Sequence, residues 1–233
     1  EAPATEQVTE AAPVLTDEVE EVPMHQALKT KFIEGGAGFM ALVIACLILG
    51  LALCIERILY LGFSKTNTKK LLAKIEEALK NGGVAAATDV CRNTRGPVAS
   101  IFTQALIRLA DGQSLEEVEK AVVSYGGVEA SKMEQNLSWI SLFIAIAPSL
   151  GFLGTVIGMI QAFDAIMVAG DMSPAVVAGG MKVALITTVG GLIVAVILQI
   201  FFNYILSQVE SLTIDMEDAS ISLMDILVKN QGK

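Results

Sequence analysis

SLGFLGTVIGMIQAFDAIMVAGDMSPAVVAGGMKVALITTVGGLIVAVILQIFFNYI, residues 149–205, decides the fold of this chain. The stretch predicts two membrane-spanning helices joined by a short turn, because it is apolar for longer than one bilayer crossing requires. Each helix carries small residues at helical spacing, where a lipid-facing helix would carry Leu and Ile. On the first helix these are Gly151, Thr155, Gly158 and Ala162, and on the second Gly180, Ala184, Thr187, Gly191 and Ala195. The pattern indicates either close helix packing or a narrow polar path lined by hydroxyls.

The composition also places the chain in a bilayer. Hydrophobic residues make up 53% of it and charged residues 18%, and the mean hydropathy is +0.61. Soluble domains carry about 25% charged residues. The odd number of cysteines and the single His25 give no disulfide framework and no metal spacing. Because no phosphate loop, catalytic acid pair or Ser/His/Asp set is present, we predict no enzyme, no cofactor and no nucleic-acid partner.

The fold class predicted is an all-α membrane protein with three transmembrane helices, extended by long polar helices. The segments, in chain order, are an acidic disordered tail at 1–24, an interfacial amphipathic helix at 25–37, a first span at 38–63, a polar helical region at 64–137, a second span at 138–168, a turn at 169–178, a third span at 179–205 and a polar C-terminal helix at 206–233. A simple linker is the alternative for the segment at 25–37.

Local signals predict the details of the polar region. Residues 81–83, Asn-Gly-Gly, are expected to stop its first helix. Ser114 and Glu117 form a capping box that opens a long helix running towards the second span. The pair at 126–127, both glycines, is expected to kink that helix, and Pro148 to kink the second span. The adjacent Glu56 and Arg57 at the end of the first span are interpreted as a solvated or mutually paired couple.

The distribution of positive charge predicts the orientation. Residues 64–137 hold ten of the sixteen Lys and Arg, residues 1–37 hold two, and the loop 164–178 holds none. Since loops rich in Lys and Arg stay on the cytoplasmic side, the N-terminus is expected outside, and the large loop and the C-terminus inside.

Three spans in this order, the large loop after the first, LGFLGTVIGMIQAF at 150–163 behind Ala-Pro, and ALITTVGGL at 184–192 resemble the MotA/TolQ/ExbB family of ion-channel subunits, most of all its ExbB branch. The resemblance implies a homopentamer around a pore in the bacterial inner membrane. It implies an ExbD- or TolR-like partner with one span and a membrane Asp. Ion flow down the proton-motive force would then drive a TonB-like protein and energise outer-membrane transport.

The resemblance also implies roles for particular residues. Thr155 and Thr187 match the threonines that face the pore in the family, and the small residues beside them would complete its lining: Gly151, Gly158, Ala184 and Gly191. ExbB-like chains often carry a Glu five residues before the third-span Thr, and this chain has Lys182 there. Lys182 is expected at the outer mouth, reaching the interface or pairing with Asp164 or Asp171.

The residues themselves limit how ions could pass. No acid, base or His lies between residues 151 and 161 or between 183 and 198. Threonine hydroxyls donate and accept hydrogen bonds but do not titrate near neutral pH, so a partner must supply the carboxylate. The alternative role for Thr155 and Thr187 is packing, and Thr188 is assigned to a helix or subunit contact. A TolQ-like subunit, a gliding-motor stator and a non-conducting membrane scaffold therefore remain alternative functions, and Na⁺ an alternative ion.

Overall fold

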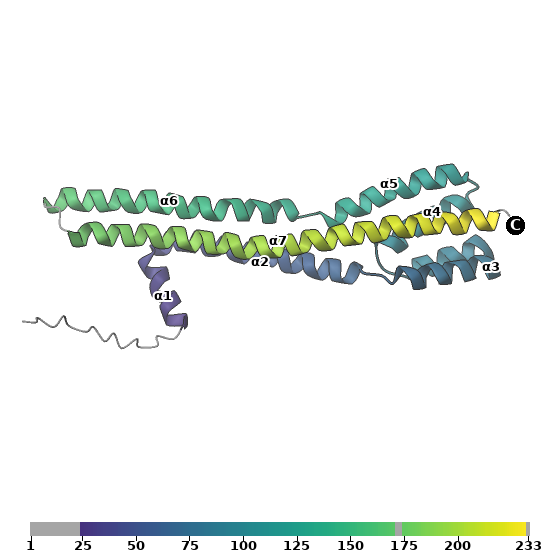
Figure 1. Ribbon diagram of the computed structural model, residues 1–233, viewed down its shortest axis with the longest axis horizontal. Helices are drawn as coiled ribbons and strands as arrows, with labels where there is room; N and C mark the ends of the chain where they lie inside the picture. The colour runs from purple at the N-terminus through teal and green to yellow at the C-terminus, as the bar shows by residue number, and fades with distance from the viewer. Residues whose placement is uncertain (1–23, 171–173, 232–233) are drawn as a thin grey trace, which may run out of the picture.

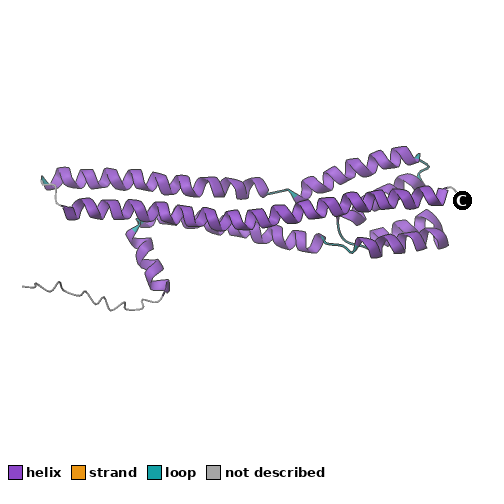
Figure 2. Cartoon of the chain, in the orientation of Figure 1, coloured by secondary structure: helices purple, strands orange, loops and turns teal. Residues whose placement is uncertain are grey.

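The computed structural model describes residues 24–170 and 174–231, which are helical apart from short connections (Figure 1, Figure 2). Residues 1–23 of the tail predicted at 1–24, together with Asp171, lie outside this part. The helices, in chain order, are α1 (Met24–Glu34), α2 (Ala37–Ser64), α3 (Thr68–Arg92), α4 (Pro97–Ala110), α5 (Leu115–Met133), α6 (Leu137–Ala169) and α7 (Pro174–Gln231). The described chain has no strand, so the all-α fold class is confirmed.

Three of these helices, α2, α6 and α7, are long and apolar enough to cross a membrane. α6 and α7 form an antiparallel hairpin, and α2 packs along the middle of α7 (Figure 1). The chain is therefore a membrane protein, with the bilayer-crossing helices gathered at one end of an elongated molecule.

The other end is a polar bundle made of α3, α4, α5 and the second half of α7 (Figure 1). Its core holds Ile75, Phe102, Leu106 and Leu223, each with 0% of its surface exposed. Cys91 lies in the same core, where burial raises the pKa of its thiol to about 12. α7 runs without interruption from the membrane part into this bundle, as the apolar pattern after residue 205 predicts.

The break between the polar region and the second span differs from its prediction. α5 is helical through Gly126 and Gly127, and the chain breaks instead between Met133 and Leu137. At the break, Asn136 takes a left-handed backbone conformation with φ of 68° and forms the N-cap of α6. The glycines cost the helix stability but do not end it.

The Asn-Gly-Gly signal ends a helix as predicted: Gly83 leaves the helical conformation with φ of 69°, so α3 consists of two helical stretches that meet at this kink, the second of which ends at Arg92. One other boundary moved. α7 begins at Pro174, five residues before the predicted span, because proline is well suited to the first turn of a helix. The capping box is confirmed: Ser114 accepts a hydrogen bond from the Glu117 amide, and the Glu117 carboxylate accepts one from the Ser114 amide.

α1 leaves the bundle at an angle to the long helices (Figure 1). The corner between α1 and α2 is a glycine pair, and Gly35 is buried beside Ile186 of α7. A Cβ atom on Gly35 would lie 2.9 Å from the Ile186 side chain, so only glycine allows this approach. That α1 lies on a membrane surface remains a prediction.

Candidate functional site

The small residues of α6 and α7 meet each other within one chain. A Cβ atom on Gly151 would lie 3.0 Å from the carbonyl oxygen of Thr187, and one on Gly158 would lie 3.1 Å from the Cβ of Ala184. Gly191 packs directly on the Ala147 carbonyl oxygen. We call this contact the α6–α7 seam. It brings together the residues predicted to line an ion path, and it does so as close backbone packing.

Three threonine hydroxyls gather at the seam. Thr187 is 1% exposed, and its hydroxyl donates to the Ala184 carbonyl at 2.7 Å and to the Gly151 carbonyl at 3.4 Å. Thr188 is half-buried and donates to the same Gly151 carbonyl at 3.2 Å. Thr155, also half-buried, donates to the Phe152 carbonyl of its own helix. The helix contact expected for Thr188 is thus observed.

Gly154 makes the burial of Thr187 possible. A Cβ atom on Gly154 would lie 2.6 Å from the Thr187 hydroxyl oxygen, so any larger residue would displace the threonine. The sequence analysis did not assign Gly154 to this face. Its position three residues after Gly151 is the spacing of one helix face and was the signal that could have identified it.

α2 covers one flank of the seam. A Cβ atom on Gly190 of α7 would lie 3.2 Å from the Met40 side chain of α2. A Cβ atom on Gly50 of α2 would lie 2.6 Å from the Leu198 side chain of α7. Thr188 stands two residues before Gly190, about 200° around the helix, and so lies on the flank away from α2. The hydroxyls are therefore reached from the side of the hairpin that α2 leaves open.

The two charges predicted at the outer mouth lie near the tip of the hairpin. Asp164 follows Ala162 by two residues, and Lys182 follows Gly180 by two, where Ala162 and Gly180 are in contact. Two residues are about 200° of helix, so both charged side chains point away from the seam. Because the helices are antiparallel, the two residues lie about 6 Å apart along the hairpin, with Asp164 nearer the tip. Both are exposed in the single chain.

A second polar cluster joins α2 to the break between α5 and α6. The sequence analysis interpreted its Glu56 and Arg57 as a solvated or mutually paired couple, and the two are paired. Arg57 is only 4% exposed. Its Nε donates to the Glu56 carboxylate at 2.7 Å, its Nη1 donates to the Lys132 carbonyl at 3.3 Å, and its guanidinium lies 4.7 Å from the centre of the Tyr60 ring. The side chain of Lys132 donates a hydrogen bond to the Glu129 carboxylate, and this contact raises the pKa of Lys132. No sequence signal shows that Arg57 reaches residue 132.

Within the described residues, no three His, Cys, Asp or Glu side chains gather as possible metal ligands. The polar groups that the structure brings together are the threonine hydroxyls on α6 and α7 and the buried Arg57 guanidinium at the break between α5 and α6.

Comparison with known proteins identifies the family to which the chain belongs. A sequence profile described as the MotA/TolQ/ExbB proton channel family matches residues 93–218, which include both helices of the seam. A biopolymer transport protein ExbB homolog from Methanothermobacter thermautotrophicus is 34% identical over 181 residues, covering 77% of this chain and 63% of that relative. The chain thus spans less than two thirds of that relative's length. An ExbB-like protein from Synechocystis is 27% identical, covering 67% of this chain and 74% of its own. The protein exbB1 of Vibrio cholerae is 39% identical over 66 residues, covering 28% of this chain and 29% of its own.

Proposed function

Because the chain belongs to the MotA/TolQ/ExbB proton channel family, we propose that it is the pore-forming subunit of an inner-membrane motor of the ExbB–ExbD type. Such a motor would use the proton-motive force to energise TonB-dependent transport across the outer membrane. The names of its relatives, which refer to biopolymer transport, support this choice within the family. The proposal includes a homo-oligomer, with five subunits as the resemblance implies.

The proposed ion path follows the open flank of the α6–α7 seam. Thr155 and Thr188 offer hydroxyls along this flank, and Thr187 lies directly behind them. The glycines and alanines of the seam would form the wall: Gly151, Gly158, Ala184 and Gly191. The observation that carries the proposal is the gathering of three hydroxyls on two helices whose exposed side chains are mostly aliphatic and aromatic. Asp164 and Lys182 are proposed as structural charges at the outer end.

This wall has no proton carrier of its own. No ionisable side chain lies on α6 between residues 138 and 163 or on α7 between 183 and 203. Because an unsupported charge is costly at membrane depth, protons need a titrating group beside the hydroxyls. We propose that an Asp on the single span of an ExbD- or TolR-like partner supplies it.

The test is proton flux in proteoliposomes that hold a pH-sensitive dye. We expect little flux from the purified chain alone and clear flux when a single-span partner is present. Thr155→Val combined with Thr188→Val should abolish the flux without changing assembly, because the change removes hydroxyls at nearly constant volume. Thr213→Val, which removes a comparable hydroxyl from the polar bundle, is the matched control. Flux from the chain alone, or full flux in the double variant, would overturn the proposal.

A non-conducting scaffold is the second candidate, and the seam favours it at one point. Thr187 and the four small residues named above are packed within the chain, as a purely structural hairpin requires. Thr155→Cys in a chain without native cysteines separates the two. The channel predicts that a small thiol reagent reaches residue 155 in the assembled complex, and the scaffold predicts that it does not.

A further inference from the structure

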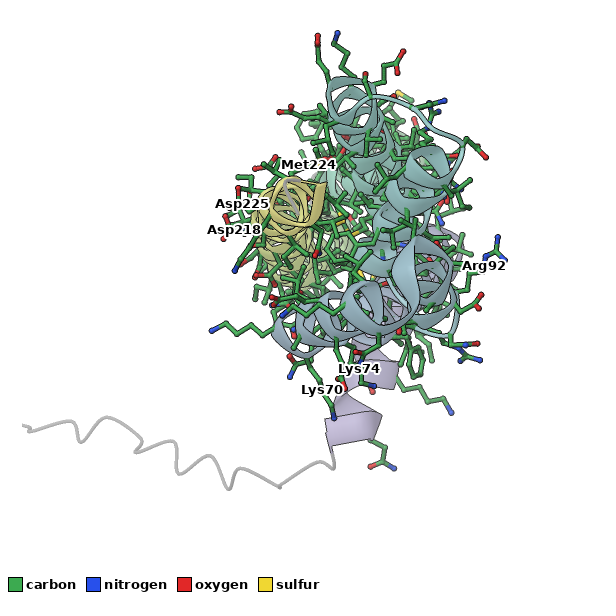
Figure 3. All side chains as sticks on the ribbon, turned by 90° about the vertical axis from the view of Figure 1, so that its right-hand side faces the viewer. Lys70, Lys74, Arg92, Asp218, Met224 and Asp225 are labelled. Carbon is green, nitrogen blue, oxygen red and sulfur yellow. The ribbon has the colours of Figure 1, made fainter. Side chains whose placement is uncertain are left out.

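The polar bundle carries opposite charges on different sides. Residues 65–95, which contain α3, hold seven Lys and Arg against three Asp and Glu. Residues 206–231, the second half of α7, hold five Asp and Glu against one Lys. Viewed along the long axis, Lys70 and Lys74 stand on one side of the bundle and Asp218 and Asp225 on another (Figure 3). One chain therefore presents both halves of a possible electrostatic contact.

The acidic side of α7 also exposes aliphatic side chains at heptad spacing. Ile214, Ile221 and Val228 are 58%, 64% and 56% exposed, and they follow each other every seven residues. Acids flank this row on both sides: Glu210 and Glu217 on one, Asp218 and Asp225 on the other. We call these seven residues the acidic face. An apolar row between charged flanks is typical of a helix that packs against another helix.

The flanking charges decide what covers this row. Apart from Lys229 at its far end, the charges beside it are negative, so two acidic faces would repel each other if they met. The complement is a helix with basic flanks, and α3 provides one in the same molecule. Its exposed lysines Lys69, Lys70 and Lys74 form the basic face. Within the described chain, none of Lys70, Lys74, Asp218 and Asp225 forms an ion pair.

The two faces lie at matching heights along the molecule. Lys65 and Thr68, at the start of α3, line a common hollow with Ser211 and Asp215 of α7. From there, α7 and the stretch of α3 before Gly83 run along the long axis towards the same end (Figure 1). Lys74 is six residues beyond Thr68, about 9 Å, which brings it to the level of Asp218. A rotation about an axis along the long helices keeps heights unchanged, so a ring of copies would place these residues side by side.

We propose that the acidic face of one copy packs against the basic face of the next in a head-to-tail ring. Lys70 and Lys74 pair with Asp218 and Asp225 across the contact, and the lysine stems cover Ile221. The proposal rests on the proposed function only in that the chain works as a homo-oligomer. It adds which surfaces meet, and it excludes a symmetric α7–α7 contact.

Charge reversal tests the contact in the full chain, purified in mild detergent and weighed by native mass spectrometry. Asp218→Lys with Asp225→Lys should remove the oligomer and leave folded monomers with unchanged helicity. Lys70→Glu with Lys74→Glu should do the same, and the four changes together should restore the oligomer. Glu116→Lys with Glu119→Lys, an exposed acidic pair on α5, is the matched control and should leave the mass unchanged.

A cross-link supplies the second readout. Lys74→Cys and Asp218→Cys, in a chain without native cysteines, should form a disulfide between two copies that carry different tags. A wild-type mass for the Asp218/Asp225 variant, or failure of the four-fold change to restore the oligomer, would overturn the proposal. So would the absence of a cross-link between copies. A cross-linked ring that passes no protons would keep this contact and refute the channel, so the two failures are distinguishable.

Discussion

Arg57 is the residue whose role the sequence conceals most. It stands next to Glu56 at the end of an apolar run, where a pair of adjacent opposite charges is usually solvated. In the structure its guanidinium is buried and bonds both its neighbour and the Lys132 carbonyl at the end of α5. Because that carbonyl has no partner within its helix, the arginine holds the end of α5 against α2.

Replacing Arg57 by Gln should therefore loosen the break between α5 and α6. Hydrogen bonds to a charged group are worth about 1.5–3 kcal/mol, so we expect the free energy of unfolding to fall by about 2 kcal/mol. The measurement is thermal unfolding in detergent, together with limited proteolysis between residues 133 and 137. Arg92→Gln, at an exposed position on α3, is the control. Equal stability and equal cleavage in the two variants would show that Arg57 does not hold the break.

At the scale of the helices, the α6–α7 seam depends on glycine at particular positions. A Cβ atom on Gly191 would overlap the Ala147 carbonyl oxygen, which belongs to the backbone and cannot turn aside. Gly179, on the same helix, has no atom within 4 Å of its Cβ position. The two glycines thus separate the need for close approach from the effect of glycine on helix stability.

Gly191→Ala should destabilise the hairpin by about 1–3 kcal/mol, the usual cost of overpacking. Gly179→Ala should instead stabilise α7 by about 0.5–1 kcal/mol, because alanine loses less backbone entropy in a helix. Thermal unfolding of both variants in the same detergent gives the comparison. If Gly191→Ala is as stable as Gly179→Ala, the helices are further apart than the seam requires.

The same helices show how far sequence reasoning reaches. Spacing of small residues placed Gly151, Gly158, Ala184 and Gly191 on one face, and that face is observed. The capping box at Ser114 was predictable because all of its bonds are local. The break before α6 was not predictable, since it depends on the contact between Arg57 of α2 and Lys132 of α5, which are 75 residues apart in the chain. Which threonine is buried was not predictable either, because it depends on how closely α6 approaches α7 at Gly154.

At the scale of the whole molecule, the hairpin reaches well beyond the corner between α1 and α2 (Figure 1). Gly35 lies beside Ile186, and α7 begins at Pro174. The twelve residues between Pro174 and Ile186 span about 18 Å of helix. If α1 lies on the outer membrane surface, as its sequence predicts, the tip that carries Asp164 and Lys182 stands outside the hydrocarbon. An apolar tip in that position would need cover from neighbouring copies or from a partner.

Cysteine labelling in intact cells tests this arrangement and the predicted orientation together. In a chain without native cysteines, a membrane-impermeant thiol reagent added outside should label Asp164→Cys and Lys182→Cys, because the tip is expected in water. Val196→Cys, which is exposed on α7 about 15 Å from Ile186 on the side where lipid is expected, should stay unlabelled. Lys70→Cys and Asp225→Cys should react only after the cells are opened, because the lysine-rich region is predicted to stay inside. Labelling of residues 70 and 225 from outside would reverse the topology. If residues 164 and 182 are not labelled, while residues 70 and 225 still react only in opened cells, the tip lies within the bilayer and α1 does not lie on the membrane surface.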